Sequence, residues 1–331
     1  MIRLALPSDG ELHDTSLTFL AAAGLSVHRP SARRYTGAIP SLPGTAVIFQ
    51  RSQDITTKVE EGSADLGICG LDRYLEYRQE EGGALLVLED LGFGGCDLVV
   101  AVPDSWVDVS TMDDLADVSL EFRQRGAQLR VVTKYFRLVQ RFFLAHGINY
   151  FSLISSTGAL EAAPAAGYGD IIVDITATGV TLRENRLKTL DDGIVLSSQA
   201  CLVGNRRRLS SPEALDSTRS MLETMEGYLR ARSFCRLTAN VRAESPEEVA
   251  RIILSRRELS GLQGPTVSRV YTPSGEGWYS VSLVVARGKL MEEVEHLRRA
   301  GATDMTASQV SYLFQKSCQA YERLLSLLGK A

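Results

Sequence analysis

Short apolar runs alternate with amphipathic segments through the first part of the chain. Residues 12–23 have helical spacing and end at Gly24, and another helical segment ends at Gly62. The apolar runs of strand length lie at 2–6, 46–49, 64–70 and 85–88. Strands that alternate with helices predict an α/β domain with a largely parallel sheet.

The glycine-rich segment Gly92–Cys96 interrupts this alternation, and a strand over 97–102 follows it, stopped by Pro103. Glycine absorbs changes in backbone dihedral angles, so the segment is typical of a crossing between domains, although a β-bulge explains it equally well. A second α/β lobe is predicted beyond it. Its strands are expected at 130–135 and 151–154, its helix at 136–146, and strands that return to the first lobe at 194–196 and 200–203.

The last hundred residues have a different element order. A capped helix is predicted from Ser245–Pro246 to about Leu259, and a second one over 289–300. Strands are expected at 234–241, at 266 onwards, at 277–285 and at 309–314, before a final amphipathic helix over 318–328. The order βαββαβ is that of the ferredoxin-like motif. Small domains of this kind often bind amino acids, an analogy at the level of fold.

Composition narrows the class of protein. A chain of 331 residues, 44% hydrophobic and 23% charged, is typical of a globular protein with two or three domains. The net charge of −4 argues against a general nucleic-acid binder, and no apolar run approaches membrane-spanning length. The five cysteines have no C-x-x-C spacing, and the first residues lack the pattern of a signal peptide, so we expect reduced thiols and a cytoplasmic protein.

The stretch from Gly158 to Asn185 carries the strongest chemical signal. Glu161 opens a short helix that Gly167 is expected to end, and the apolar run 171–175 is a strand that contains Asp174. The turn Thr176–Thr181 leads to a helix near Leu182.

A strand, a hydroxyl-rich turn and a helix start together favour anion binding, because backbone N–H groups at a helix start point into the turn. Gly179 permits close approach to a phosphate, and Thr178 and Thr181 add hydroxyl donors. Asp174 repels phosphate, so it is expected to accept hydrogen bonds from sugar hydroxyls or to face a magnesium ion. The combination predicts a sugar phosphate as ligand, whereas the turn alone is equally compatible with an ordinary strand–turn–helix.

This stretch fits the pattern G-x-x-E-x-A-P-x-x-G-x-x-D-x-x-x-D-x-x-x-x-G-x-T-L-x-x-N, and it closely resembles the phosphoribosyl pyrophosphate signature of the ATP phosphoribosyltransferase family. The resemblance spans almost the whole chain, and Gly261–Val267 resembles the histidine-sensing domain of the family's long form. It implies an enzyme that condenses ATP with phosphoribosyl pyrophosphate to give phosphoribosyl-ATP and pyrophosphate, the first step of histidine biosynthesis, with feedback inhibition by histidine.

The resemblance also implies an architecture. A two-lobed catalytic part, similar to periplasmic binding proteins, precedes a ferredoxin-like (ACT-like) α+β domain. The first lobe is expected to comprise residues 1–96 with 187–229, the second residues 97–186, and the regulatory domain residues 230–331. Magnesium on the pyrophosphate and a homo-oligomer, from dimer to hexamer, are implied as well. No nucleic acid or membrane partner is expected.

Residue roles follow from the same resemblance. Asp174 takes the ribose hydroxyls with Glu161 nearby as the second catalytic residue, and Asn240 and Thr266 are regulatory candidates. The expected substrate-binding residues are Thr176, Ala177, Thr178, Gly179, Val180, Thr181, Arg33, Arg51 and Lys134. One departure stands out: the first turn reads Asp9-Gly10-Glu11, where the family typically has Lys-Gly-Arg. Two anions in a polyphosphate pocket are unfavourable, which motivates an alternative: a non-catalytic paralogue that binds a nucleotide or amino acid as a regulatory subunit.

Overall fold

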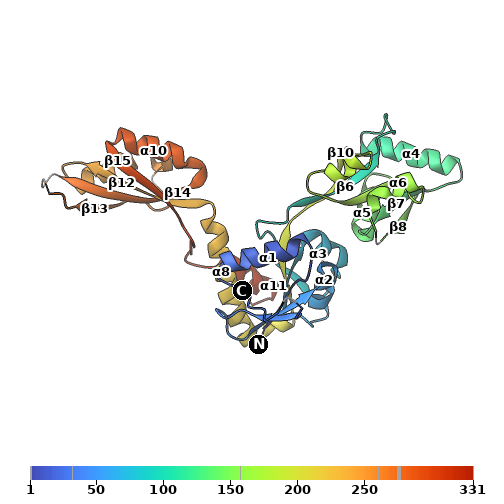
Figure 1. Ribbon diagram of the computed structural model, residues 1–331, viewed down its shortest axis with the longest axis horizontal. Coiled ribbons are helices and arrows are strands. Elements are labelled where there is room, and N and C mark those ends of the chain that lie inside the picture. Colours follow the sequence, from blue (N-terminus) through green and yellow to red (C-terminus); the bar gives the residue numbers. More distant parts are fainter. Residues whose placement is uncertain (1, 32, 157, 260, 274–276, 331) are drawn as a thin grey trace. The chain divides into compact units, whose positions relative to one another are not determined.

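The computed structural model describes residues 2–31, 33–156, 158–259, 261–273 and 277–330, and its elements are labelled in Figure 1. The chain forms two compact units. The first contains the residues up to Ala21, Leu25–Thr218 and the residues from Arg323 on, and the second contains Arg219–Glu322 with Ala22–Gly24. The first unit holds two sheets and the second unit holds one.

The first sheet has six strands in the order β2-β3-β1-β4-β11-β5. β1, β3 and β4 are parallel, and β11 runs antiparallel between β4 and β5. Every residue of β4 and β11 is buried, because these central strands are covered on both faces. The elements are β1 (Ile2–Pro7), α1 (Glu11–Ala22), β2 (Thr36–Ala38), β3 (Thr45–Gln50), α2 (Ser52–Glu60), β4 (Leu66–Gly70), α3 (Leu71–Tyr77), β5 (Ala84–Leu88) and β11 (Ala200–Asn205).

The second sheet has five strands in the order β10-β6-β9-β7-β8. Alternate residues of β6 enter two separate hydrophobic clusters, Leu98 and Val100 in one and Val99 and Ala101 in the other, so this sheet is also buried on both faces. The elements are β6 (Cys96–Pro103), α4 (Met112–Gln124), β7 (Leu129–Thr133), α5 (Phe136–Ala145), β8 (Phe151–Ser155), η1 (Leu160–Ala162), α6 (Ala163–Ala166), β9 (Ile171–Thr176), α7 (Val180–Glu184) and β10 (Leu187–Ser198).

The chain crosses between these sheets where the glycine-rich segment predicted a crossing. β5 belongs to the first sheet and β6 to the second, and Gly94 between them has φ +69°. A Cβ on Gly94 would lie 2.7 Å from Cδ2 of Leu12, so a larger residue does not fit without movement. The predicted two-lobed fold is confirmed, but the segment 194–196 was placed wrongly. It lies in β10, where Leu196 pairs with Leu98 of β6, so it completes the second sheet instead of returning to the first.

The second unit holds a four-stranded antiparallel sheet in the order β13-β14-β12-β15, which confirms the ferredoxin-like prediction. Its elements are β12 (Phe234–Arg242), α9 (Pro246–Leu254), η3 (Arg257–Leu259), β13 (Thr266–Val270), β14 (Trp278–Ala286), η4 (Arg287–Lys289), α10 (Leu290–Arg299) and β15 (Ala302–Gln309). Odd-numbered residues of β12 and β14 pack against Val249, Ile253 and Leu297 of α9 and α10. The helices cover one face only, and α10 lies along the sheet in Figure 1.

The last strand was predicted too late in the sequence. β15 spans Ala302–Gln309, so only the first residue of the strand predicted over 309–314 lies in a strand, and residues 310–314 are irregular. The sequence of β15, ATDMTASQ, lacks an apolar alternation because the strand lies at the sheet edge and most of its residues are exposed.

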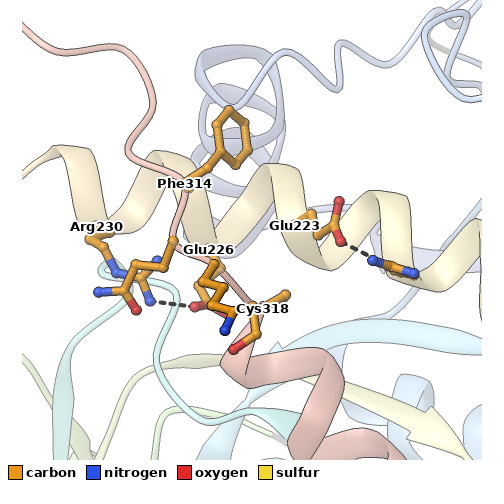
Figure 2. A pocket seen from close by; sticks show the side chains of 10 residues that line it. Glu223, Glu226, Arg230, Phe314 and Cys318 are labelled. Atoms are coloured by element: carbon orange, nitrogen blue, oxygen red, sulfur yellow. Dashed lines mark hydrogen bonds and ion pairs between the residues drawn. The ribbon is translucent and has the colours of Figure 1, made fainter.

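Two helices connect the units along the chain. α8 (Pro212–Ala231), which follows η2 (Arg208–Ser210), and α11 (Gln319–Leu327) each have residues in both units. Glu226 of α8 caps the start of α11, since its carboxylate accepts hydrogen bonds from the Ala320 amide at 2.7 Å and the Cys318 thiol at 3.1 Å. Figure 2 shows this carboxylate beside Cys318 and in an ion pair with Arg230. Burial alone would raise the pKa of Glu226, but these hydrogen bonds outweigh it and hold the pKa below its ordinary value.

Candidate active site and regulatory pocket

The carboxyl ends of β7 and β9 place Lys134 next to Asp174. The strands are parallel with Thr133 opposite Val173, so Lys134 and Asp174 are the next residues on the same edge. The Thr133 hydroxyl donates to the Val173 carbonyl at 2.7 Å and fixes this register. Ligands bind at the carboxyl edge in open α/β sheets, so a basic and an acidic side chain lie where a ligand is expected.

The loop after Asp174 is built around Gly179. Its amide donates to Oγ1 of Thr176 at 2.9 Å, and its φ of +70° lies in the left-handed region. The predicted helix starts at Val180, earlier than the expected Leu182. Ala177, Thr178, Val180 and Thr181 are exposed, and Thr176 and Gly179 are half-buried. The loop therefore presents hydroxyl groups and the open amides of a helix start to solvent.

Asp174 is half-buried, and burial raises the pKa of its carboxyl. A hydrogen bond from the Ile175 amide at 2.9 Å and the nearby charges of Lys134 and Arg73 oppose this rise, whereas Glu161 adds to it. Lys134, Arg73 and Glu161 therefore each lie within electrostatic range of Asp174. A partly desolvated carboxylate with two neighbouring cations can accept hydrogen bonds from sugar hydroxyls beside a bound polyphosphate.

Glu161 lies in η1, immediately before α6. Pro164 occupies the first turn of α6, and Gly167, at φ +79°, ends that helix, as predicted. The short helical segment sets Glu161 near the Asp174 edge, which agrees with the electrostatic effect of Glu161 on the pKa of Asp174.

The first sheet has a carboxyl edge of its own. β1 and β3 end together, with Pro7 opposite Gln50, so the turn Asp9–Glu11 and Arg51 lie at one edge. The side chains of Asp9, Glu11, Arg51 and Arg33 are all exposed. Arg51 is the residue before α2, and Arg33 lies in the loop between α1 and β2. Among the residues described, no hydrogen bond or ion pair joins Arg33 or Arg51 to Asp174 or to its loop.

Sequence reasoning missed Asp72, Arg73 and Tyr135. The Tyr135 hydroxyl donates to Oδ2 of Asp72 at 2.7 Å, and the Arg73 guanidinium carbon lies 4.4 Å from the centroid of the Tyr135 ring. A signal was present: Asp72 and Arg73 directly follow the buried strand that ends at Gly70, so they had to lie at the carboxyl edge.

The second unit contains a pocket of about 740 Å³ next to β13 and β14. Thr266, predicted as regulatory, lines it and pairs with Ser282 across the strands. Asn240 pairs with Ser280 on the neighbouring row and is not among the lining residues. Other lining residues are Arg230, Phe234, Arg236, Leu262, Gln263, Val284 and Phe314. The lining combines guanidinium groups, hydroxyl groups and apolar side chains.

The first unit is thus a two-lobed α/β protein, similar in architecture to periplasmic binding proteins, with an anion-binding type of loop at the carboxyl edge of one lobe. Residues 51–227 match the family model described as ATP phosphoribosyltransferase, and residues 231–312 match that of the HisG C-terminal domain. The chain belongs to the ATP phosphoribosyltransferase family, and its reaction is the first step of histidine biosynthesis.

Individual relatives support this assignment along the full chain. ATP phosphoribosyltransferase 1, chloroplastic, of Arabidopsis thaliana is 38% identical, and the alignment covers 99% of this chain and 81% of the relative. ATP phosphoribosyltransferase of Bradyrhizobium diazoefficiens is 35% identical, with 99% and 98% covered. The solved ATP phosphoribosyl transferase (HisG:HisZ) complex from Thermotoga maritima has a TM-score of 0.53 and 26% identity, covering 68% of this chain and 96% of that chain. The enzyme class predicted from Gly158–Asn185 is therefore confirmed.

Proposed function

We propose that the carboxyl edge of the second sheet binds phosphoribosyl pyrophosphate and that the carboxyl edge of the first sheet binds ATP. The observation that carries this assignment is the loop 176–181 directly after Asp174, with Gly179 at φ +70°. The loop amides and the hydroxyls of Thr176, Thr178 and Thr181 hold the 5′-phosphate, and Asp174 accepts hydrogen bonds from the ribose hydroxyls. Ala177 and Val180 contribute backbone donors.

The reaction forms a bond between a ring nitrogen of adenine and the anomeric carbon of the sugar, while the bond from that carbon to pyrophosphate breaks. Positive charge develops on the sugar, and negative charge on the leaving group. The carboxylates of Asp174 and Glu161 stabilise the first, and Lys134 stabilises the second. Arg33 and Arg51 bind the ATP phosphates from the first sheet, because guanidinium groups match phosphate geometry. Neutral adenine needs no general base to attack.

Magnesium fits this site as an ion that enters with the pyrophosphate. The described residues contain no group of three or more His, Cys, Asp or Glu side chains placed to hold a metal. Mg²⁺ in phosphate sites typically keeps several waters and uses one or two carboxylates besides the phosphates. Asp174 and Glu161 would supply such a pair, and a bound ion would add positive charge beside the pyrophosphate group.

Release of pyrophosphate tests this proposal. Purified protein with ATP, phosphoribosyl pyrophosphate and Mg²⁺ should release pyrophosphate and form phosphoribosyl-ATP, detected by coupled pyrophosphatase assay and by mass spectrometry. Omitting either substrate is the control. Absence of turnover across a range of divalent metals would contradict the proposed site and favour a regulatory paralogue, the alternative that Asp9 and Glu11 suggested.

We further propose that residues 230–331 form the regulatory part and that histidine binds in the pocket lined by Thr266 and Arg236 to inhibit turnover. The pocket offers a cation for the carboxylate of an amino acid and hydroxyls for its polar groups. Asn240 lies on the row of paired residues next to that of Thr266, and we keep it as a candidate for an indirect contact with histidine.

Histidine binding can be tested with a matched pair of hydroxyl deletions in β13. Thr266→Ala should raise the Kd for histidine, measured by calorimetry on the full chain, about five- to tenfold through loss of one hydrogen bond. Ser268 lies two residues further along the same strand and does not line the pocket. The substitution Ser268→Ala should therefore leave the Kd for histidine unchanged. Equal effects of both substitutions, or no binding to the wild-type chain, would contradict this assignment.

The remaining proposals concern assembly and location. The polar, uncovered face of the third sheet suits contact with another copy, and we propose a homo-oligomer between dimer and hexamer, testable by light scattering. None of the described helices is long and apolar enough to cross a membrane. We propose a cytoplasmic location on the five free cysteines, while the Arabidopsis relatives carry the word chloroplastic in their names.

A further inference from the structure

Helix α3 of the first sheet and the start of helix α5 of the second sheet are joined by a group of buried contacts. Tyr135, the residue before α5, is fully buried, and its hydroxyl donates to Oδ2 of Asp72 at 2.7 Å. Asp72 is itself only 4% exposed. Its other oxygen, Oδ1, accepts a hydrogen bond from Ser198 at 2.8 Å, at the end of β10 where the chain crosses back to the first sheet.

Glu76 lies one turn after Asp72 on α3 and supplies the cap that α5 lacks. No side chain of the residue before α5 caps that helix. Instead, the two carboxylate oxygens of Glu76 accept hydrogen bonds from the Arg137 amide at 3.0 Å and the Leu138 amide at 3.1 Å. A carboxylate at the N-terminus of a helix satisfies free amides and complements the helix dipole. The cap of a helix in one lobe thus comes from the other lobe.

This group of contacts continues into the proposed substrate edge. The Tyr135 amide donates to Oγ1 of Thr133 at 3.0 Å, and the Thr133 hydroxyl donates to the Val173 carbonyl at 2.7 Å. Thr133 is fully buried, so water does not compete for these bonds. Lys134 lies between Thr133 and Tyr135, and Asp174 follows Val173. Hydrogen bonds therefore lead from α3 to Thr133 and Val173, which are the covalent neighbours of the two charged residues of the edge.

We propose that Asp72, Glu76 and Tyr135 are positioning residues for phosphoribosyl transfer: they hold Lys134 and Asp174 in a fixed relation to the first sheet, so that the two substrates meet. We call these residues the α3–α5 clamp. The inference rests on the proposed site, because Lys134 and Asp174 are assigned to the phosphoribosyl pyrophosphate edge. Arg73 stacks on the Tyr135 ring and adds a cation of the first lobe beside this edge.

Removal of one hydroxyl tests the clamp. Tyr135→Phe keeps the ring and deletes the bond to Asp72, so kcat should fall about tenfold, since small misplacements of reactants are costly. The Kd for phosphoribosyl pyrophosphate alone should stay within about twofold of the wild-type value, because its proposed ligands all lie in the second lobe. Tyr74→Phe is the matched control: it deletes a buried hydroxyl from α3 whose bond, 3.3 Å to the Ala84 carbonyl, remains within the first sheet. Its kcat should be unchanged.

A second measurement does not depend on turnover. Hydrogen exchange at the Arg137 and Leu138 amides should become faster in Tyr135→Phe and stay unchanged in Tyr74→Phe, because only the former loosens the cap from Glu76. Equal kcat losses in the two variants, or unchanged exchange at these amides, would overturn the clamp. A wild-type chain without turnover but with the predicted exchange difference would instead refute the proposed substrate edge and leave the clamp intact.

Discussion

The sheets of the first unit and the sheet of the second unit place their polar groups differently. In the first unit, β4 and β11 are buried along their whole length, and polar side chains gather at the carboxyl ends of strands. Asp72 and Lys134 follow β4 and β7, and Asp174 lies near the end of β9. In the second unit, helices cover only one face, and hydroxyl groups such as those of Thr238 and Ser282 lie along the other face of the strands themselves.

The extent to which helices cover a sheet decides where that sheet can bind a ligand. When helices cover both faces of a sheet, only the ends of its strands remain accessible to a ligand. Residues that bind substrate are therefore expected at the carboxyl ends of these strands. A sheet covered on one face leaves a surface on which a small molecule contacts several strands at once, as in the pocket lined by Thr266 and Arg236. Substitutions at the carboxyl ends of the strands in the first two sheets are therefore expected to change turnover. Substitutions in the third sheet are expected to change only inhibition and stability.

The largest expected effect comes from Asp174→Asn. The loss of the charge that we propose faces the sugar should lower kcat/KM about a hundredfold, the scale seen for removal of one electrostatic stabiliser. Because burial raises the pKa of Asp174 in the folded chain, its ionised form opposes folding. Its contribution to stability is present below the ordinary carboxyl pKa of 3.8 and is lost as the pH rises through the folded pKa. The variant should therefore unfold at the same temperature as the wild type or higher at neutral pH.

Asp170→Asn is the control for this substitution, since Asp170 lies just before the other end of the same strand. Its carboxylate pairs with Arg130 at 2.8 Å, far along the strand from the loop. Calorimetry should show a lower unfolding temperature with little change in kcat/KM. If Asp174→Asn and Asp170→Asn lower kcat/KM equally, the carboxyl end of β9 has no special role in catalysis.

A smaller effect is expected from Gly179→Ala. A side chain at φ +70° costs about 1–2 kcal/mol of stability and should disturb the amides that we propose bind the phosphate. The Kd for phosphoribosyl pyrophosphate, measured by calorimetry, should rise about tenfold. Gly147→Ala at the end of α5 has a similar φ of +72° and open space for a Cβ, so it should cost similar stability and leave this Kd unaltered. Similar affinities for both variants would remove the loop from the binding site.

The smallest catalytic effect is expected in the second unit, from Glu293→Gln. Glu293 of α10 is 2% exposed, and among the described residues its Oε2 has no hydrogen-bond partner. Burial raises its pKa from 4.5 to about 7, with Glu292 and Glu258 adding to the rise and Arg256 and Lys289 opposing it. The wild-type chain should lose stability of this unit as the pH rises from about 4.5 to 7, whereas the variant should not.

Thermal unfolding across this pH range measures the effect, and kcat should stay at the wild-type value throughout. Glu295→Gln changes an exposed side chain on the same helix whose charge is not among the causes of the raised pKa of Glu293. It is the control and should keep the wild-type pH dependence. A pH dependence that is the same in all three proteins would show that Glu293 does not titrate in this range.

Local sequence patterns were sufficient to predict several elements of the structure. Glycines at 167 and 179 marked a helix end and a tight loop, and both have positive φ. α4 went unpredicted although Thr111 and Asp114 form a capping box that the sequence displays. α3 gave no such signal, because it follows β4 directly and Gly70 offers no side-chain cap. The strand β15 was hidden by its hydroxyl-rich composition.

The family, the two α/β lobes, the ferredoxin-like order and the loop after Asp174 could all be predicted from the order of the residues. Burial and backbone conformation leave periodic and glycine signals among neighbouring residues. Two pairings became visible only in the folded chain: β10 joins the second sheet, and Asp72 contacts Tyr135, 63 residues away. Such pairings depend on which strand edge and which helix terminus remain unsatisfied after all elements have formed, and no local pattern of residues records that.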